Sequence, residues 1–155
     1  MRKLPLVKLI DIPPVWLFGF CVLSWMQSEF LNFGLSIGGV WSDFLSGLMV
    51  GAGFLLMLLA VSEMRKHRTT VIPHFNADHL VVSGIFKRSC NPIYLGDVLI
   101  PAGLILRWDA VLALPLIPVF ISILKRRFIM PEDNRLCITF RADFAKYCQS
   151  VRRWL

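Results

Sequence analysis

Charged side chains are scarce in this 155-residue chain, where Asp, Glu, Lys and Arg together make up 17% of the residues, against about 25% in soluble domains. Hydrophobic residues make up 56%, which is more apolar surface than one small domain can bury in its own interior. A disordered chain and an ordinary water-soluble domain are therefore both disfavoured. The remaining class is an integral membrane protein, and the length predicts one domain over residues 1–155.

Closely spaced cysteine pairs are also missing. The four cysteines are Cys21, Cys90, Cys137 and Cys148, and no two of them form a C-x-x-C pair. Neither a zinc site nor a disulfide framework is implied. The three histidines are loosely spaced and have no cysteine pair nearby, so we expect no metal ion.

Positive charge is in excess, with 17 Lys and Arg against 10 Asp and Glu. In a soluble protein this balance would suggest a nucleic-acid partner. In an apolar chain it indicates flanking segments that stay on the cytosolic side and face anionic lipid. We therefore expect membrane lipid as a partner and no nucleic acid.

Four apolar stretches predict membrane-spanning helices at about residues 12–31, 44–62, 92–106 and 110–125. A membrane helix needs roughly 20 apolar residues, and the first two stretches meet this need. A signal peptide is the competing interpretation of the first. Pro13 and Pro14 interrupt its start and no A-x-A cleavage motif follows, so we expect a retained helix.

The last two stretches are shorter. Residues 110–124 form a charge-free run of 15 residues that contains Pro115 and Pro118, and such a run covers about 22 Å of a hydrocarbon core about 30 Å thick. A short polar tip at residues 107–109 separates the two stretches. This pattern predicts a helical hairpin packed against the first two spans, with a re-entrant pair as the alternative.

The distribution of positive charge predicts the orientation. With four crossings and a cytosolic N-terminus, 16 of the 17 Lys and Arg residues lie inside and only Arg107 lies outside, as the positive-inside rule requires. Both termini and the loop at residues 63–91 should then be cytosolic. A multi-pass protein of this kind is compatible with a bacterial inner membrane.

The two cytosolic segments are patterned. Residues 63–91 are rich in turn-forming residues, which indicates a structured loop. Residues 131–154 predict an amphipathic helix, because aromatic and aliphatic residues recur along one face: Leu136, Phe140, Phe144, Tyr147, Val151 and Trp154. Such a helix should lie on the membrane surface or cap the bundle. The predicted fold is therefore an all-α membrane bundle of four helices with a cytosolic C-terminal helix.

Two motifs carry a family resemblance. Residues 80–96 read LVVSGIFKRSCNPIYLG, which resembles the LVTSGPYR-x-x-R-(H or N)-P-x-Y-x-G signature of the isoprenylcysteine carboxyl methyltransferase and phospholipid methyltransferase superfamily. The tail is similar to that family as well, with the acidic pair Glu132 and Asp133, spaced aromatic residues and a basic end. The resemblance covers roughly residues 69–155.

The resemblance implies an integral membrane methyltransferase that uses S-adenosylmethionine, with S-adenosylhomocysteine as product, and that has no Rossmann domain. The chain contains no G-x-G-x-x-G motif after a strand, consistent with that implication. The implied acceptor is lipophilic, either like an isoprenylcysteine carboxylate or like a phospholipid. The alternative is a non-catalytic four-helix scaffold or transport component that retains the fold.

The resemblance also implies the site residues. Asn91, Tyr94 and Glu132 are the implied catalytic residues. The implied cofactor-binding residues are Asp78, His79, Leu80, Val81, Phe86, Asn91, Pro92, Ile93, Tyr94 and Glu132. Arg126 and Arg127, one turn before Glu132, are a hypothesis for the substrate head group.

The residue types suit such a ligand. A zwitterionic sulfonium compound with an adenine ring needs hydrogen-bond donors, a carboxylate for its ammonium group and an apolar surface for its ring. Asn91 and backbone N–H groups around Gly84 can supply the donors, and Glu132 the carboxylate. Phe86 can supply the apolar surface together with Leu80 and Val81.

The chain departs from the family pattern at three positions. Cys90 replaces an arginine, Phe86 replaces a tyrosine, and Arg141 stands where a glycine would permit a turn. The last replacement disfavours the turn.

Asp97 lies one turn after Tyr94, nominally inside the bilayer. An ionisable residue at that depth is a functional candidate by default. The interpretation we prefer from the sequence is a hydrogen-bonded bundle residue near the interface.

Overall fold

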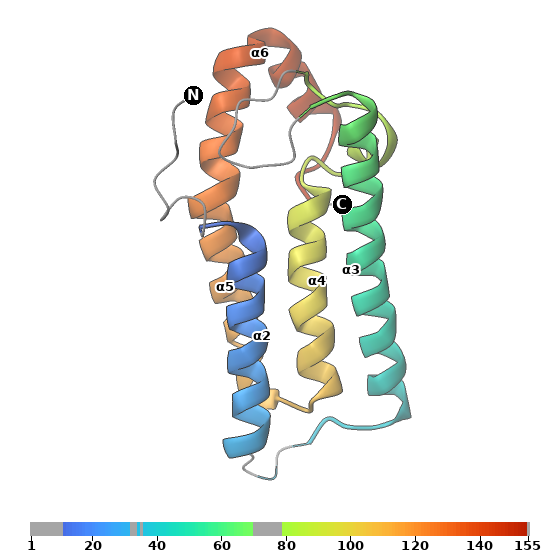
Figure 1. Cartoon of the computed structure of the whole chain (residues 1–155), viewed down its shortest axis with the longest axis vertical. Coiled ribbons are helices and arrows are strands. Elements are labelled where there is room, and N and C mark those ends of the chain that lie inside the picture. Colours follow the sequence, from blue (N-terminus) through green and yellow to red (C-terminus); the bar gives the residue numbers. More distant parts are fainter. Residues whose placement is uncertain (1–10, 32–33, 35, 70–78, 155) are drawn as a thin grey trace.

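The computed structural model describes residues 11–31, 34, 36–69 and 79–154, and every regular element in these residues is helical. The all-α prediction is confirmed for this part of the chain. Figure 1 shows the five α-helices side by side or end to end. They are α2 (Pro13–Phe30), α3 (Val40–Lys66), α4 (Pro92–Arg107), α5 (Leu116–Leu124) and α6 (Met130–Ser150).

Helix α4 is the centre of the bundle. It packs most extensively on α3 and also contacts α2 and α5, and it lies between α2 and α3 in Figure 1. Two glycines permit the close approach of α3 and α4, because a Cβ on Gly96 would lie 2.6 Å from the carbonyl oxygen of Gly53. Small residues at a helix contact are the usual means by which helices pack closely in membranes.

Helix α3 is long and apolar enough to cross a membrane. It has 27 residues, with a mean hydropathy of 2.3 over its best window, and at 1.5 Å per residue it is about 40 Å long. Several of its large side chains are exposed, among them Phe44, Leu48, Leu55 and Leu58. No other helix in the described residues meets the same criterion of length and composition.

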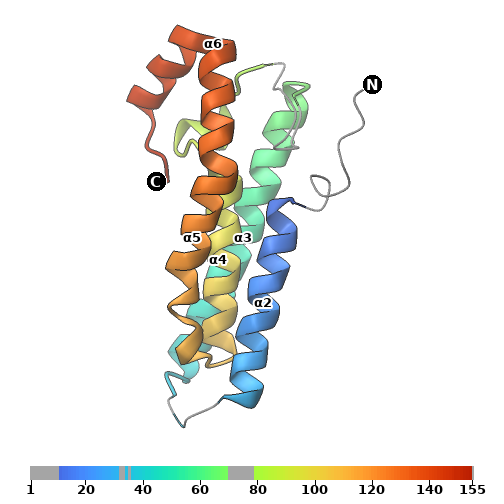
Figure 2. The same ribbon diagram turned by 90° about the vertical axis from the view of Figure 1, so that its left-hand side faces the viewer.

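The segment after α4 differs from the expected helix over residues 110–125. Asp109 adopts a positive φ of 53°, the short 3₁₀-helix Val111–Ala113 follows, and α5 begins only at Leu116. Pro115 fixes its φ at −62° immediately before α5, as a proline at a helix start does. Helices α4 and α5 still run antiparallel (Figure 2), as the hairpin interpretation predicts.

The helical backbone continues from α5 into the C-terminal tail. The π-helical segment Lys125–Ile129 joins α5 to α6 without a break, and Figure 2 shows the three as one rod. The buried cluster beside this rod holds Phe20, Tyr94, Phe120, Leu124, Phe128 and Ile129. The rings of Phe20 and Phe120 are 4.8 Å apart, so α2 and α5 meet in this cluster.

The helix predicted over residues 131–154 is present as α6, but it is not continuous. Arg141 has φ 41° and ψ −109°, and the chain turns sharply there, so that the second half of α6 folds back (Figure 2). The helix ends at Ser150. The turn forms although arginine replaces the family's glycine, so the aromatic residues before and after Arg141 do not share one helix face.

The end of the chain lies beside the loop that precedes α4. The Cys90 N–H donates to the carbonyl oxygen of Arg152 at 3.0 Å, and the Ser89 hydroxyl donates to that of Arg153 at 3.3 Å. The Arg153 guanidinium also pairs with Asp133 at 2.8 Å. The turn at Arg141 therefore brings the two predicted cytosolic motifs together.

Candidate active site

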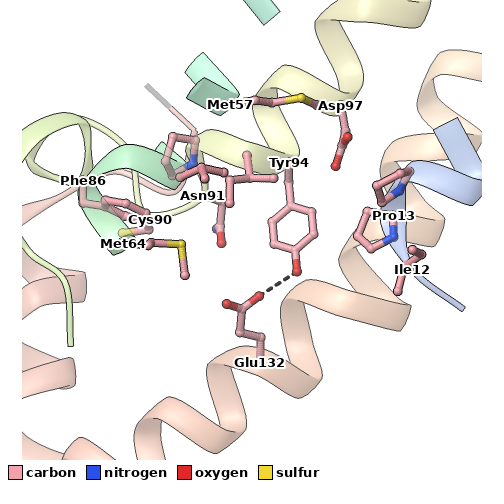
Figure 3. Close-up of a pocket in the computed structure, with 14 residues that line it drawn as sticks. Ile12, Pro13, Met57, Met64, Phe86, Cys90, Asn91, Tyr94, Asp97 and Glu132 are labelled. Carbon is pink, nitrogen blue, oxygen red and sulfur yellow. Dashed lines mark hydrogen bonds between the residues drawn. The ribbon is translucent and has the colours of Figure 1, made fainter. Parts of the chain in front are cut away.

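A cavity of about 340 Å³ lies where α4 begins (Figure 3). Its wall comes from the start of α2, the second half of α3, the loop before α4, the first turns of α4 and one residue of α6. The lining residues are Ile12, Pro13, Pro14, Met57, Val61, Met64, Phe86, Cys90, Asn91, Pro92, Ile93, Tyr94, Asp97 and Glu132. Its size and its apolar wall with a few polar groups are typical of a small-molecule site.

Tyr94 and Glu132 join α4 to α6 across this cavity. The Tyr94 hydroxyl donates a hydrogen bond to Glu132 Oε2 at 2.7 Å, and Tyr94 is buried. Burial raises the pKa of Glu132, and the hydrogen bond from Tyr94 acts in the opposite direction by stabilising the carboxylate. The pair presents a carboxylate in an apolar wall, which suits a cationic ligand group.

Asn91 occupies the residue before α4. Its φ of −131° lies outside the helical range, because Pro92 restricts the residue that precedes it. The Asn91 side chain is buried, and its Nδ2 has no hydrogen-bond partner among the described residues. Buried donors are normally satisfied, so this amide is available to a ligand in the cavity.

Asp97 lies deeper along α4 than Asn91. It is 1% exposed, and neither carboxylate oxygen has a hydrogen-bond partner in the described part of the chain. The hydrogen bond expected for Asp97 is therefore not found among the described residues. The sequence gives its position on the helix but does not show that the surrounding side chains offer no partner.

The loop before α4 is held in place from two sides. The Tyr147 hydroxyl donates to the carbonyl oxygen of Phe86 at 2.7 Å, and burial raises the pKa of Tyr147, which keeps it protonated as a donor. On the other side, the Ser83 hydroxyl donates to Glu63 at 2.5 Å. Gly84 has φ +58°, and a Cβ there would lie 2.8 Å from the Glu63 side chain, so the Ser-Gly pair of the motif fits this contact.

The cavity contains six of the predicted site residues: Phe86, Asn91, Pro92, Ile93, Tyr94 and Glu132. His79, Leu80 and Val81 lie outside its wall, and Val81 is buried elsewhere. Asp78 lies outside the described residues. The motif therefore locates the α4 side and the α6 side of the cavity.

Sequence reasoning missed the wall formed by α2 and α3. Met57, Val61 and Met64 of α3 line the cavity opposite Ile12 and the prolines of α2. These residues belong to generic apolar stretches, and no motif distinguishes them from their helical neighbours. Only their place in the fold identifies them.

Arg126 and Arg127 lie in a different groove, of about 550 Å³, between α2 and α5. Arg127 donates to Asp11 at 2.8 Å, and its guanidinium lies over the Trp16 ring at 5.4 Å. Neither arginine lines the cavity that contains Tyr94 and Glu132.

The fold and the cavity define a class of protein: a helical bundle with a long apolar helix and with carboxyl groups in the wall of a small-molecule cavity. The phospholipid methyltransferase family profile matches residues 41–141, well over half of the chain, and the chain belongs to that family. The match includes Asn91, Tyr94 and Glu132, and it confirms the resemblance carried by the two motifs. No curated protein and no solved structure matches the chain significantly.

Proposed function

We propose that this family member transfers a methyl group from S-adenosylmethionine to a lipophilic acceptor at the cytosolic face of a membrane. One observation carries the proposal: the Tyr94–Glu132 pair and the unpartnered Asn91 amide meet in one apolar cavity. A purely structural contact between α4 and α6 would not need a carboxylate in an apolar wall beside an unsatisfied amide donor.

The residues present fit this cosubstrate. Glu132 would hold its ammonium group, the Asn91 amide would donate to one of its acceptors, and Phe86 would contact its ring. When bound, S-adenosylmethionine supplies a methyl group on a positively charged sulfur. The fit rests on the unpartnered amide, because a buried donor normally has a partner and a ligand in the cavity would supply one.

The side chains of the site would act mainly by holding the bound molecules in place and by enclosing them. Tyr94 fixes the Glu132 carboxylate at a defined position on α6, and the hydrogen bond from the Tyr147 hydroxyl to the Phe86 carbonyl oxygen fixes the loop. Methionine, proline and valine side chains of α2 and α3 keep water out of the cavity. Positioning and desolvation of the reacting groups would account for the catalysis of this methyl transfer.

The same proposal includes four membrane crossings with both termini in the cytosol. Helix α3 is long enough to cross the membrane by itself. Helices α2 and α4 and the rod that begins with α5 would cross as its partners in the bundle. Ile12 of α2 and Met57 and Val61 of α3 form apolar walls of the cavity. A lipophilic acceptor would reach the site sideways from the bilayer between α2 and α3.

The head group of a neighbouring lipid would meet Arg126. Asp11 already neutralises Arg127, and Arg126 is exposed in the groove beside Trp16 and Ile123. A basic side chain next to an apolar groove suits an anionic amphiphile.

Calorimetric titration with S-adenosylhomocysteine tests the proposal. We expect the parent protein to bind, and Glu132→Gln and Asn91→Ala to bind at least about tenfold more weakly, because each removes a polar contact in a buried site. Glu29→Gln, an exposed acid at the other end of α2, is the control and should bind like the parent. Absence of heat with the parent protein would favour the non-catalytic scaffold instead.

Transfer of a labelled methyl group into a total lipid extract identifies the acceptor. We expect label in an amphiphilic product that partitions into organic solvent. Label found only in water-soluble products would contradict the lipophilic acceptor while leaving methyl transfer itself intact.

A further inference from the structure

Asp97 is the buried acid that the proposed binding of S-adenosylmethionine does not use. Its side chain is almost completely buried, and both of its oxygens lack hydrogen-bond partners among the described residues. A buried carboxylate without a partner is costly to the fold, and an ionisable residue in this state is a candidate for a functional site.

Asp97 faces the same cavity as Glu132 but at a different depth. It lies three residues after Tyr94 on α4, which places both side chains on one face of the helix, and Figure 3 shows Tyr94 between Asp97 and Glu132. Figure 3 shows the apolar residues Met57 of α3 and Pro13 of α2 near Asp97, and both line the cavity. The end of the cavity that holds Asp97 is therefore the part that a lipophilic molecule would occupy.

The ionisable carboxyl groups of the cavity wall have no basic counterpart in that wall among the described residues. Two carboxyl groups, Asp97 and Glu132, line it, and no Lys, Arg or His from the described residues does. In a poorly polarisable apolar setting, unlike charges attract and like charges repel more strongly than in water. Such a wall attracts a cationic head group and repels a carboxylate.

We propose that Asp97 binds the head of the methyl acceptor and selects an amine-bearing amphiphile over an amphiphilic carboxylate. This inference rests on the proposed function and deepens it, because it decides between the two acceptor types that the sequence leaves open. Glu132 then serves the ammonium group of the cosubstrate, and Asp97 serves the amine of the acceptor. The two acids have separate ligands at the two ends of one cavity.

Octylamine and octanoate, which share a chain length and differ in head-group charge, test the inference. Their binding is measured by calorimetry on the purified protein saturated with S-adenosylhomocysteine, so that Glu132 is occupied. We expect the parent to bind octylamine at least about tenfold more tightly than octanoate, as a charge-assisted contact implies. Asp97→Asn should bring the two affinities to within about threefold, and Asp97→Glu should keep the preference for octylamine.

Asp43→Asn is the matched control, because Asp43 is in the first turn of α3 and does not line the cavity; it should keep the parent's preference. Equal affinity of the parent for the two amphiphiles, or an unchanged preference in Asp97→Asn, would overturn the inference. Heat from S-adenosylhomocysteine in the same samples separates the two proposals. If that ligand binds and the preference is absent, the role of Asp97 is wrong and the methyltransferase proposal stands. If that ligand does not bind, the methyltransferase proposal fails, and the inference that rests on it fails as well.

Discussion

Glu132 is a carboxyl group in an apolar wall whose hydrogen bond comes from the hydroxyl of Tyr94. Burial favours the neutral form and raises its pKa, while the Tyr94 bond favours the charged form. Only the charged form pairs with an ammonium group. The acid–base state of this one side chain should therefore control ligand binding.

The affinity for S-adenosylhomocysteine should fall as the pH is lowered. Because the pKa of Glu132 is raised, the loss should begin at a higher pH than for an ordinary glutamate, whose pKa is about 4.3. Tyr94→Phe should move the loss to still higher pH, since it removes the bond that stabilises the carboxylate. Titrations between about pH 5 and pH 8 measure this, and Glu132→Gln should show no such dependence. A parent affinity that stays constant with pH would contradict the prediction.

The sequence located part of the site residue by residue. Asn91, Tyr94 and Glu132 stand out because they occupy fixed positions in two motifs. Asp97 could be placed on the helix but not evaluated, because its significance lies in the partners it lacks. Met57 and Val61 could not be found at all, since an apolar residue in a helix gives no sign of which cavity it faces.

At the scale of elements, the contact between α3 and α4 depends on glycine. The backbone of Gly53 lies so close to Gly96 that neither position has room for a side chain. Gly51, two residues away on α3, has nothing within 4 Å of its would-be Cβ. The two faces of α3 therefore respond differently to the same substitution.

Gly96→Ala should lower the free energy of unfolding by about 1–3 kcal/mol, because the new methyl group overpacks the contact. Gly51→Ala is the control and should leave stability unchanged or raise it slightly, since alanine favours the helix. Thermal unfolding of the detergent-solubilised proteins measures both. Equal effects of the two substitutions would show that α3 and α4 do not approach as closely as described.

The turn within α6 uses a backbone conformation that suits glycine. Arg141 has φ 41° and ψ −109°, where a Cβ clashes with the backbone. Arg141→Gly should raise the free energy of unfolding by about 1 kcal/mol by removing that strain. Arg141→Ala, which keeps the Cβ, should change it by less than about 0.5 kcal/mol. Stability lower in the glycine variant than in the alanine variant would contradict a strained turn.

At the scale of the whole molecule, the tail completes the site from outside the bundle. Residues 151–153 lie beside the loop at residues 89–90, and Asp133 pairs with Arg153. The loop leads directly into Asn91. The basic end of the chain, which the sequence suggested as a helix terminus, instead holds the cavity wall in place.

The orientation in the membrane is tested with a reporter that is active only outside the cytosol. Fused after Leu155 it should be inactive, because the positive charge near the chain end favours the cytosol. Inserted at Gly34, between α2 and α3, it should be active. Activity at the chain end would contradict four crossings with both termini inside. Activity at neither position would show that α2 does not cross.

The sequence by itself determined the class of the protein, the helical elements and the two motifs, because composition and apolar run length are properties of the linear chain. The tertiary structure decided the turn at Arg141, the pairing of the tail with the loop before α4, and the unpartnered state of Asp97. These depend on contacts between residues far apart in the chain. Hydropathy along a sequence records whether each residue favours water or an apolar environment, but not which other residue or cavity it faces.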